Sequence, residues 1–226
     1  MLAHGKQRYK LDISDSVNID DAPMTDWRDS YMLQSEDVVR YVDDPQRLLK
    51  HRATREIYPC LRNILLAHNA KSILDVGCNA GYTYDWLVDN LDRMVRYTGL
   101  DIHDTMVDEA QALHPPEVPF YTYDLYDLKD DMKHRADVVF CSRVLIHLPD
   151  FREAIEALYA ACNKALVVTI KLGDFDRVVK YKVIDRDTRK ATGEFFYLRT
   201  ISYKTLDSLG MGYRVHSTGE YTTVEF

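Results

Sequence analysis

The chain has 226 residues, of which 46% are apolar, and it carries 29 basic and 36 acidic side chains. This length supports one sizeable hydrophobic core but not two domains of ordinary size. The net charge of −7 provides no positive field that would attract a polyanion, so we expect no DNA partner and favour a small or protein-bound substrate.

No apolar run approaches the length of a transmembrane helix, and the N-terminus lacks the apolar core of a signal peptide. We therefore expect no membrane partner and a cytoplasmic location. The four cysteines, Cys60, Cys78, Cys141 and Cys162, lie far apart and lack the paired spacing of a zinc site, so we interpret them as reduced and structural. The oligomeric state is not determined by these features.

Residues 1–30 are polar and acidic, and the cluster DISDSVNIDDAPMTDW within them follows neither the helix nor the strand period, which indicates a mobile arm or a lid that orders over a ligand. Apolar residues at three- and four-residue steps between 35 and 69 predict two or three short helices, interrupted by Pro45 and Pro59. We group residues 1–70 as an N-terminal arm and helical lid. Its aromatic residues either cover a ligand or only pack the first helices: Trp27, Tyr31 and Tyr41.

From residue 71 to 226 short apolar runs alternate with helical stretches, which predicts crossover units and a parallel sheet buried on both faces. The expected strands are 72–76, 97–101, 120–123, 136–141 and 165–171. The expected helices between them are 84–92, 105–113 and 150–163. Beyond them, residues 177–199 predict a β-hairpin that turns within 185–193, Ser202 starts a short helix that ends at Gly210, and 213–217 with 221–226 form a closing hairpin.

The stretch "ILDVGCNAGY", residues 73–82, combines a buried strand with a glycine turn and a helix start. This arrangement presents backbone N–H groups to a ligand. Gly77 allows the ligand to approach the backbone, Gly81 allows helix and strand to pack closely, and Asn79 tolerates a left-handed conformation better than other non-glycine residues. Asp75 would repel a pyrophosphate and favour a ligand that carries sulfonium and ammonium groups.

These residues resemble the first motif of class I S-adenosylmethionine-dependent methyltransferases, and the resemblance extends from about residue 71 to 226. Asp101, 20 residues beyond Gly81, resembles the carboxylate that holds the ribose hydroxyls, and Asp124 with Leu125 resembles the adenine motif. The resemblance implies an α/β fold with a Rossmann-like, seven-stranded, mostly parallel sheet, helices on both faces, an antiparallel last strand and an inserted hairpin after the fifth strand. It also implies S-adenosylmethionine as cofactor.

The residues that this resemblance assigns to the cofactor are Asp75, Gly77, Cys78, Asn79, Gly81, Asp101, Ile102, Asp124, Leu125 and Ser142. Each aspartate also has a purely structural interpretation: Asp75 as a turn cap, Asp101 as a polar strand end and Asp124 as a helix N-cap. A nicotinamide oxidoreductase is a weaker alternative, because Asp75 is present and the glycine spacing is Gly-x-x-x-Gly.

The segment "CSRVLIHLPD" after the fourth strand resembles the family's acceptor loop. His147 is the candidate general base, with the alternative that its ring only caps the loop. Arg143 and Tyr31 are candidate acceptor contacts. Because no carboxylate precedes Asp150 in this segment, we expect no metal. We expect methyl transfer to an oxygen or nitrogen of a small molecule; the alternatives are a catalytically silent binding partner and an enzyme with a protein or RNA acceptor.

Overall fold

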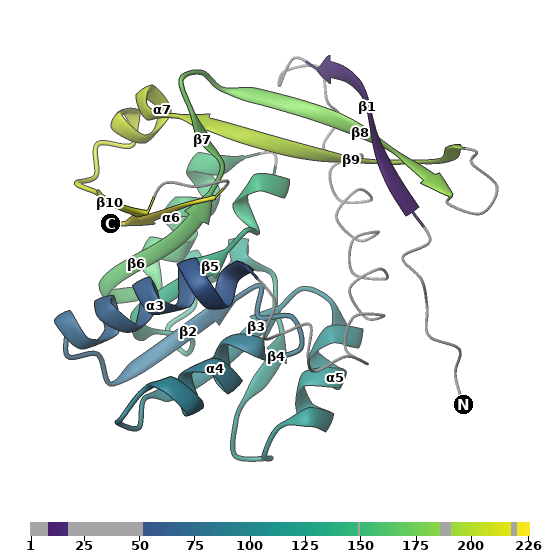
Figure 1. The fold of residues 1–226 in the computed structure, drawn as a ribbon. Coiled ribbons are helices and arrows are strands. Elements are labelled where there is room, and N and C mark those ends of the chain that lie inside the picture. Colours follow the sequence, from purple (N-terminus) through teal and green to yellow (C-terminus); the bar gives the residue numbers. More distant parts are fainter. Residues whose placement is uncertain (1–8, 18–51, 149, 186–190, 218–220) are drawn as a thin grey trace, which may run out of the picture.

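A seven-stranded sheet forms the centre of the molecule, and a four-stranded sheet lies beside it (Figure 1). The computed structural model describes residues 9–17, 52–148, 150–185, 191–217 and 221–226. In spatial order the larger sheet consists of β10 (Arg214–Ser217), β11 (Thr222–Glu225), β6 (Cys162–Ile170), β5 (Ala136–Ser142), β2 (Ser72–Val76), β3 (Arg96–Asp101) and β4 (Phe120–Thr122).

The strands from β6 to β4 all run parallel, whereas β11 is antiparallel to β6 and β10 is antiparallel to β11. This confirms the predicted mostly parallel sheet with an antiparallel end. From β2 the chain continues outward to β3 and β4 on one side, and then returns to β5 on the other side of β2. The strand order therefore reverses between β2 and β5, at their carboxyl ends. A crevice at such a point is where open α/β sheets bind ligands.

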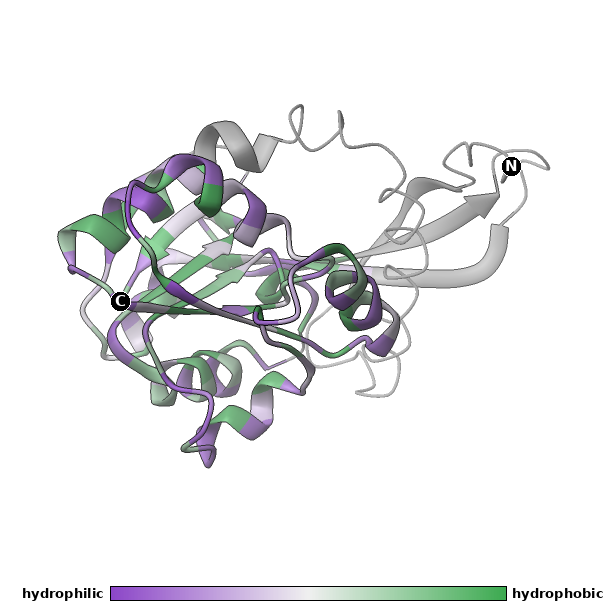
Figure 2. Ribbon diagram, turned by 90° about the horizontal axis from the view of Figure 1, so that it is seen from below, coloured by the Kyte–Doolittle hydropathy of each residue, from purple (hydrophilic) through white to green (hydrophobic). Residues whose placement is uncertain are grey.

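Helices cover both faces of this sheet, as predicted. They are α3 (Arg52–Ala67), α4 (Tyr82–Asn90) and α5 (Asp104–Leu113) on one face, and α6 (Phe151–Ala160) with the short turns η2 (Leu125–Lys129) and η3 (Leu145–His147) on the other. In Figure 2 the helices on the two sides of the sheet alternate hydrophobic and hydrophilic residues. This alternation is the sign of helices that bury one stripe against a sheet.

Successive residues of β2 show why both faces must be covered. Ile73 packs among the side chains of α3, α4 and α5, whereas its neighbour Leu74 packs among those of α6 and η2, and each is 1% exposed. Side chains along a strand point alternately to opposite faces, so a continuous apolar run fills two cores. Full burial of each such side chain contributes about 1.5–3 kcal/mol.

The helical prediction for residues 35–69 needs a correction. Residues 52–67 form the single helix α3, which runs through Pro59 without being interrupted there; the expected helices before residue 52 lie outside the described residues. A proline inside a helix removes one N–H donor. Burial of Leu61 and Leu65 in the α3–α4–α5 core compensates for that loss, since both side chains are fully buried.

The smaller sheet has the order β1 (Tyr9–Val17), β8 (Arg177–Asp185), β9 (Ala191–Ser202) and β7 (Leu172–Gly173). The predicted hairpin is confirmed as β8 and β9. Residues 9–17 of the segment predicted as a mobile arm or a lid form the strand β1, which pairs antiparallel with β8. Tyr9, Leu11 and Ile13 alternate with polar residues at the strand period, so the sequence contained a signal for β1 that the prediction did not use.

The remaining elements agree with the predictions at their ends. Ser202 caps α7 (Tyr203–Ser208) by accepting a hydrogen bond from the Thr205 amide, and Gly210 has a left-handed φ of 70° just beyond the helix. The fifth predicted strand starts earlier than expected, at Cys162, and α6 ends at Ala160. No helix in the described part of the chain has the length and apolarity needed to cross a membrane.

Candidate active site

The turn between β2 and α4 has the conformation that its sequence predicts. Gly77, Asn79 and Gly81 have φ angles of 77°, 53° and 84°, all in the left-handed region. The amides of Gly77 and Cys78 donate to the carbonyl oxygen of Leu100, at 2.7 and 3.0 Å. The turn is therefore fixed to the neighbouring strand β3 before any ligand arrives.

The two glycines are required by their neighbours as well as by their dihedral angles. A Cβ on Gly77 would lie 2.1 Å from Cγ2 of Val144, and one on Gly81 would lie 2.5 Å from Cε1 of His114. Both distances are far below van der Waals contact. Gly77 thus allows the loop after β5 to pack against the turn, a contact between segments distant in sequence that the sequence alone did not predict.

Asp101, at the end of β3, connects the turn to the second strand end. Its Oδ2 accepts a hydrogen bond from the Asn79 amide at 2.9 Å, and its Oδ1 accepts one from the His103 amide at 3.0 Å. The residue is 8% exposed, and burial raises the pKa of its carboxyl. Each oxygen keeps a second lone pair, so Asp101 can accept a further hydrogen bond from a ligand hydroxyl.

Asp75 lies deeper than the sequence suggests. Its side chain is 1% exposed, and its Oδ2 accepts a hydrogen bond from the Tyr97 hydroxyl at 2.6 Å. Burial raises the pKa of this carboxyl to about 6, although hydrogen bonds from Tyr97 and Thr83 oppose the shift. Among the described residues no basic side chain pairs with Asp75, so its negative charge is stabilised by neutral hydroxyl groups alone.

Asp124 and Leu125 follow β4 and open the turn η2. Asp124 is the N-cap, with Oδ1 accepting from the Tyr126 amide at 3.1 Å. The structural interpretation of Asp124 is thus correct for one of its oxygens. Leu125 is 5% exposed and belongs to the core between the sheet and α6.

Cys78 serves the turn itself. Its amide donates to Leu100, its carbonyl oxygen accepts from Gly81, and its thiol side chain is 4% exposed within the α3–α4–α5 core. Its contact with a cofactor remains a prediction. Ile102, directly after Asp101, is half-buried beside the same turn.

The segment after β5 is held by a threonine on β6. Ser142 Oγ lies 3.0 Å from the Thr169 hydroxyl, and the Arg143 amide donates to the Thr169 Oγ1 at 2.9 Å. Arg143 has a φ of 60°, a left-handed conformation that is uncommon for a non-glycine residue and is found often at functional sites. Its guanidinium carbon lies 5.7 Å from the ring centre of Tyr221.

His147 ends the turn η3 and contacts the hairpin. Its Nδ1 lies 3.2 Å from the carbonyl oxygen of Tyr197 on β9. A carbonyl oxygen only accepts, so Nδ1 carries the proton and the neutral ring has its lone pair on Nε2. Burial, followed by the charge of Arg143, lowers the pKa of His147 to about 4, which keeps the ring neutral near pH 7.

The comparisons with known proteins agree with this geometry. Residues 74–165, which include β2 to the beginning of β6, match the family model described as a methyltransferase domain. Residues 74–165 thus belong to a methyltransferase domain, and the fold around them is that of class I S-adenosylmethionine-dependent methyltransferases. No curated protein matches it in sequence.

Solved structures similar to the methyltransferase share its fold at low identity. The 1,6-didemethyltoxoflavin-N1-methyltransferase from Burkholderia thailandensis, with its substrate and S-adenosylhomocysteine bound, is 14% identical with a TM-score of 0.62 over 97% of this chain and 95% of that one. The S-adenosylmethionine-bound amino pentose methyltransferase from Micromonospora echinaspora is 17% identical, with a TM-score of 0.53 over 74% and 89%. Magnesium protoporphyrin IX methyltransferase from Synechocystis is 18% identical, with a TM-score of 0.51 over 74% and 76%.

The cofactor of this methyltransferase is S-adenosylmethionine, and the strand ends fit its chemistry. The ligand has ribose hydroxyls and an amino group that donate hydrogen bonds, together with a positive charge. Asp101 and Asp124 offer carboxylate oxygens at adjacent strand ends, and the buried Asp75 offers a negative charge without a basic partner among the described residues. Acceptors and negative charge are the groups that such a nucleoside needs.

Several predicted residues of the methyltransferase site cannot be placed beside these strand ends. Tyr31 lies outside the described residues, as do Trp27 and Tyr41. Within the described ranges, no three His, Cys, Asp or Glu side chains converge as metal ligands. The basic side chains predicted on the hairpin, from Lys180 to Lys190, likewise lie outside the side chains that the structure describes.

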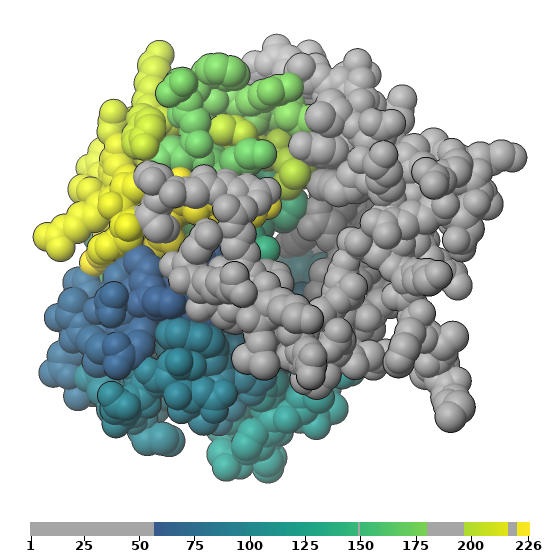
Figure 3. Space-filling model, viewed as in Figure 1, coloured from purple at the N-terminus to yellow at the C-terminus, as the bar shows by residue number. Residues whose placement is uncertain are grey.

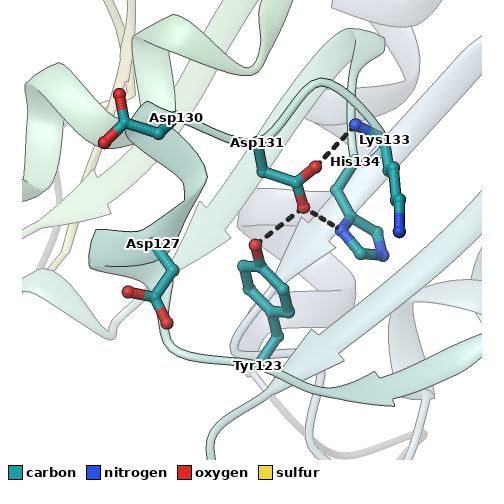
Figure 4. A pocket seen from close by; sticks show the side chains of 6 residues that line it. All are labelled: Tyr123, Asp127, Asp130, Asp131, Lys133 and His134. Carbon is teal, nitrogen blue, oxygen red and sulfur yellow. Dashed lines mark hydrogen bonds and ion pairs between the residues drawn. The ribbon is translucent and has the colours of Figure 1, made fainter.

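A shallow cavity of about 380 Å³ lies beyond the edge strand β4, lined by Tyr123, Asp127, Asp130, Asp131, Lys133 and His134. Figure 4 shows the Tyr123 hydroxyl and the His134 ring both directed at Asp131, with O···O and N···O distances of 2.7 and 2.5 Å. The three groups satisfy one another. We therefore assign this cluster to the surface structure around η2 and not to the cofactor site.

Proposed function

We propose that this methyltransferase moves a methyl group to an oxygen or nitrogen of a small-molecule acceptor, without a metal, with His147 as the general base. The observation that carries the proposal is the orientation of the His147 ring. Its Nδ1–H donates to the Tyr197 carbonyl oxygen, which leaves the basic lone pair on Nε2. The turn η3 places this group beyond the carboxyl end of β5, beside the strand ends assigned to the cofactor.

The cofactor supplies an electrophilic methyl group on a sulfonium, which leaves as a neutral thioether and needs no acid. The protein must hold the acceptor atom in line with that methyl group, exclude water and accept a proton where the acceptor has one. Because its pKa of about 4 keeps His147 neutral, the ring is ready to accept a proton over the whole physiological range. A base this weak acts on a proton whose acidity rises as the acceptor begins to bond to the methyl group.

The nucleoside is held in this proposal by residues from three strand ends. Asp101 accepts from the ribose hydroxyls, Asp124 accepts from the adenine amino group through its second oxygen, and Asp75 contributes negative charge toward the sulfonium and ammonium. The turn residues Gly77, Asn79 and Gly81 give the ligand access to the backbone, while Ile102 and Ser142 lie at its sides. Leu125 supports the adenine site from the core.

Arg143 is the proposed acceptor contact among the described residues. Its left-handed backbone lies at the carboxyl end of β5, its amide is fixed by Thr169, and its guanidinium lies over the Tyr221 ring. A planar cation fixed in this way suits a carboxylate or a carbonyl group on the acceptor. Tyr31 is proposed as a second contact from the N-terminal segment, and residues 1–70 as an arm and lid.

The structural neighbours support a small acceptor. The Burkholderia thailandensis enzyme holds 1,6-didemethyltoxoflavin together with S-adenosylhomocysteine, and its structure covers 97% of this chain. The similarity therefore extends beyond residues 74–165. The segments outside this range are where we expect the acceptor-binding additions. We accordingly propose an aromatic or heterocyclic acceptor of similar size, and a cytoplasmic location.

The test is to incubate the protein with labelled S-adenosylmethionine and fractionated cell extract, and to identify the labelled product by mass. A labelled small molecule confirms the proposed acceptor class, whereas label on protein or RNA contradicts it. Cofactor binding without label in any fraction indicates the alternative of a catalytically silent partner. Affinity for NAD with none for S-adenosylhomocysteine contradicts the cofactor itself.

Two substitutions at His147 separate its roles. His147→Asn keeps an N–H donor for the Tyr197 carbonyl but removes the base, while His147→Ala removes both. If the ring is the base, both variants lose turnover by about 10²-fold or more and bind the cofactor within about twofold of the wild type. Recovery of turnover in His147→Asn alone means that the ring only positions the loop. His134→Asn, in the surface cluster beyond β4, is the matched control.

A further inference from the structure

A buried group of polar side chains lies behind the glycine turn and comes from four elements. Asp75 on β2 accepts from the Tyr97 hydroxyl of β3 at 2.6 Å, and the hydroxyls of Thr83 on α4 and Tyr58 on α3 lie 3.5 Å apart beside it. All four residues are less than 9% exposed. Of these four residues, the sequence predicted a role only for Asp75.

The position of the Tyr97 hydroxyl is determined by the packing of its ring. The ring is 5.4 Å from that of Tyr84 and 5.7 Å from that of Phe120, both measured between centroids. In the parallel pair of β2 and β3, Tyr97 is opposite Ile73 and Gly99 is opposite Asp75. A Cβ on Gly99 would lie 2.5 Å from Cδ1 of Phe120, so this glycine makes room for the ring that packs against Tyr97.

The groups around Asp75 leave its charge dependent on neutral donors. Burial raises the pKa of the hydroxyls and thiols that face it, so they stay neutral at physiological pH: Tyr58, Cys78, Tyr97 and Cys141. The nearby carboxyl of Asp101 raises the pKa of Asp75 further. The hydrogen bond from Tyr97 is therefore the main contact that favours the ionised form of this carboxyl, and the nearby Thr83 hydroxyl lowers its pKa as well.

We propose that Tyr97 is a positioning residue of the methyltransferase, whose hydroxyl orients the Asp75 carboxylate and keeps it charged at the start of the cofactor turn. The proposal rests on the proposed function, because it assumes that the cofactor's positive charge is recognised here. Tyr97 itself does not touch the ligand. It acts by keeping negative charge available in a place where burial would otherwise favour the protonated acid.

The test is calorimetric titration of S-adenosylmethionine into wild type and Tyr97→Phe from pH 5.5 to 9. Burial holds the pKa of Asp75 at about 6 in the wild type, and loss of a hydrogen bond to a charged group raises it by about one to two units. The ratio of variant to wild-type Kd should be about two to ten at pH 7 and fall close to one at pH 9. Using the ratio cancels the titration of the ligand's own amino group.

Matched variants isolate the hydroxyl. Tyr84→Phe removes a neighbouring hydroxyl that does not reach Asp75, and its ratio should stay within about twofold of one at every pH. In an Asp75→Asn background, Tyr97→Phe should have no further effect on Kd, because the two residues act through one contact. Thr83→Val removes the other donor and should shift the pH dependence in the same direction, which provides a second test if Tyr97→Phe fails to fold.

A ratio that stays constant from pH 5.5 to 9 in both Tyr97→Phe and Thr83→Val overturns the inference, because a purely structural defect weakens binding equally at all pH values. Additive effects of Tyr97→Phe and Asp75→Asn overturn it as well. Failure of the wild type to bind S-adenosylmethionine at any pH is a different result. It contradicts the proposed cofactor site and not the role of Tyr97 within it.

Discussion

Two buried carboxylates of the same sheet differ in the side chains that surround them. Asp75 on β2 is 1% exposed, and the ionisable side chains that face it within the described residues are hydroxyls, thiols and another carboxyl; burial raises its pKa to about 6. Glu225 on β11 is 8% exposed, and although burial opposes this, hydrogen bonds to His68 and His216 lower its pKa below the usual value. Figure 3 shows α3, in dark blue, and the C-terminal segment, in yellow, side by side.

The contrast separates a ligand site from a structural clamp. Glu225 Oε1 lies 2.6 Å from Nε2 of His68 at the end of α3, and Oε2 contacts Nε2 of His216 on β10. Its charge is balanced inside the protein and joins three elements. Asp75 has no such balance among the described residues, and a buried charge without a partner is costly unless a ligand supplies one. The difference predicts distinct effects of four substitutions on cofactor binding and on the free energy of unfolding.

The largest effect on cofactor binding is expected for Asp101→Asn. Asp101→Asn removes a carboxylate that accepts from two backbone amides and, in our proposal, from the ribose. S-adenosylmethionine should bind about 100-fold more weakly, equivalent to about 2.7 kcal/mol, while the free energy of unfolding changes by about 1 kcal/mol. Calorimetry and urea unfolding measure the two quantities. Binding within threefold of wild type would remove Asp101 from the site.

Glu225→Gln should mainly reduce stability and leave cofactor binding nearly unchanged. Loss of the charge between two partly buried histidines should lower the free energy of unfolding by about 2 kcal/mol near pH 6, with cofactor Kd within about twofold of wild type. Because the pKa of Glu225 is lowered in the folded state, its stabilisation is present above the unfolded value of 4.5 and is lost as pH falls below it. Urea unfolding at pH 6 and pH 3 checks both points, and equal differences at the two pH values would contradict the clamp.

Asp75→Asn sharpens the comparison because binding and stability should move in opposite directions. Binding of S-adenosylmethionine at pH 8 should weaken by about tenfold. The raised pKa means that wild-type stability is greatest below pH 3.8 and declines until pH passes about 6. The variant avoids this decline, so relative to wild type it should gain up to about 3 kcal/mol between pH 4 and pH 7. A parallel pH dependence of unfolding in both proteins would refute the assignment.

The smallest effect tests whether burial is the deciding factor. Asp92 forms an ion pair with Arg62 at 3.6 Å, but its side chain is 99% exposed. Asp92→Asn should change the free energy of unfolding by less than about 0.5 kcal/mol and leave the cofactor Kd unchanged. A larger loss in urea unfolding would mean that exposed charges also contribute substantially to this fold.

The sequence predicted much of the fold because parallel strands buried on two faces have a distinctive pattern. Val138–Cys141 is apolar throughout, and Ile73–Val76 is apolar except for Asp75; such runs are short and are separated by amphipathic helices. The turn was predicted for a similar reason, since only residues such as Gly77, Asn79 and Gly81 adopt left-handed dihedral angles readily. Hydrophobic periodicity and dihedral preference therefore predict the elements that depend only on nearby residues.

The continuity of α3 through Pro59 was missed because packing on the sheet outweighs the local effect of the proline. The strand β1 was missed for a different reason. Tyr9, Leu11 and Ile13 alternate with polar residues as in a strand, but the segment is acidic and its partner β8 is distant in the sequence. The clamp at Glu225 was missed as well, since His68 and Glu225 are 157 residues apart in the sequence.

By itself the sequence determined the order of the elements, the methyltransferase turn and which carboxylates stand at the strand ends, since these follow from periodicity and from the dihedral freedom of single residues. Only the tertiary structure decided that Tyr97 faces Asp75, that Val144 fills the space above Gly77 and that His147 donates to Tyr197. The physical reason is that a pKa and a hydrogen-bond partner depend on what surrounds a side chain in space, and those neighbours come from strands and loops that folding alone brings together.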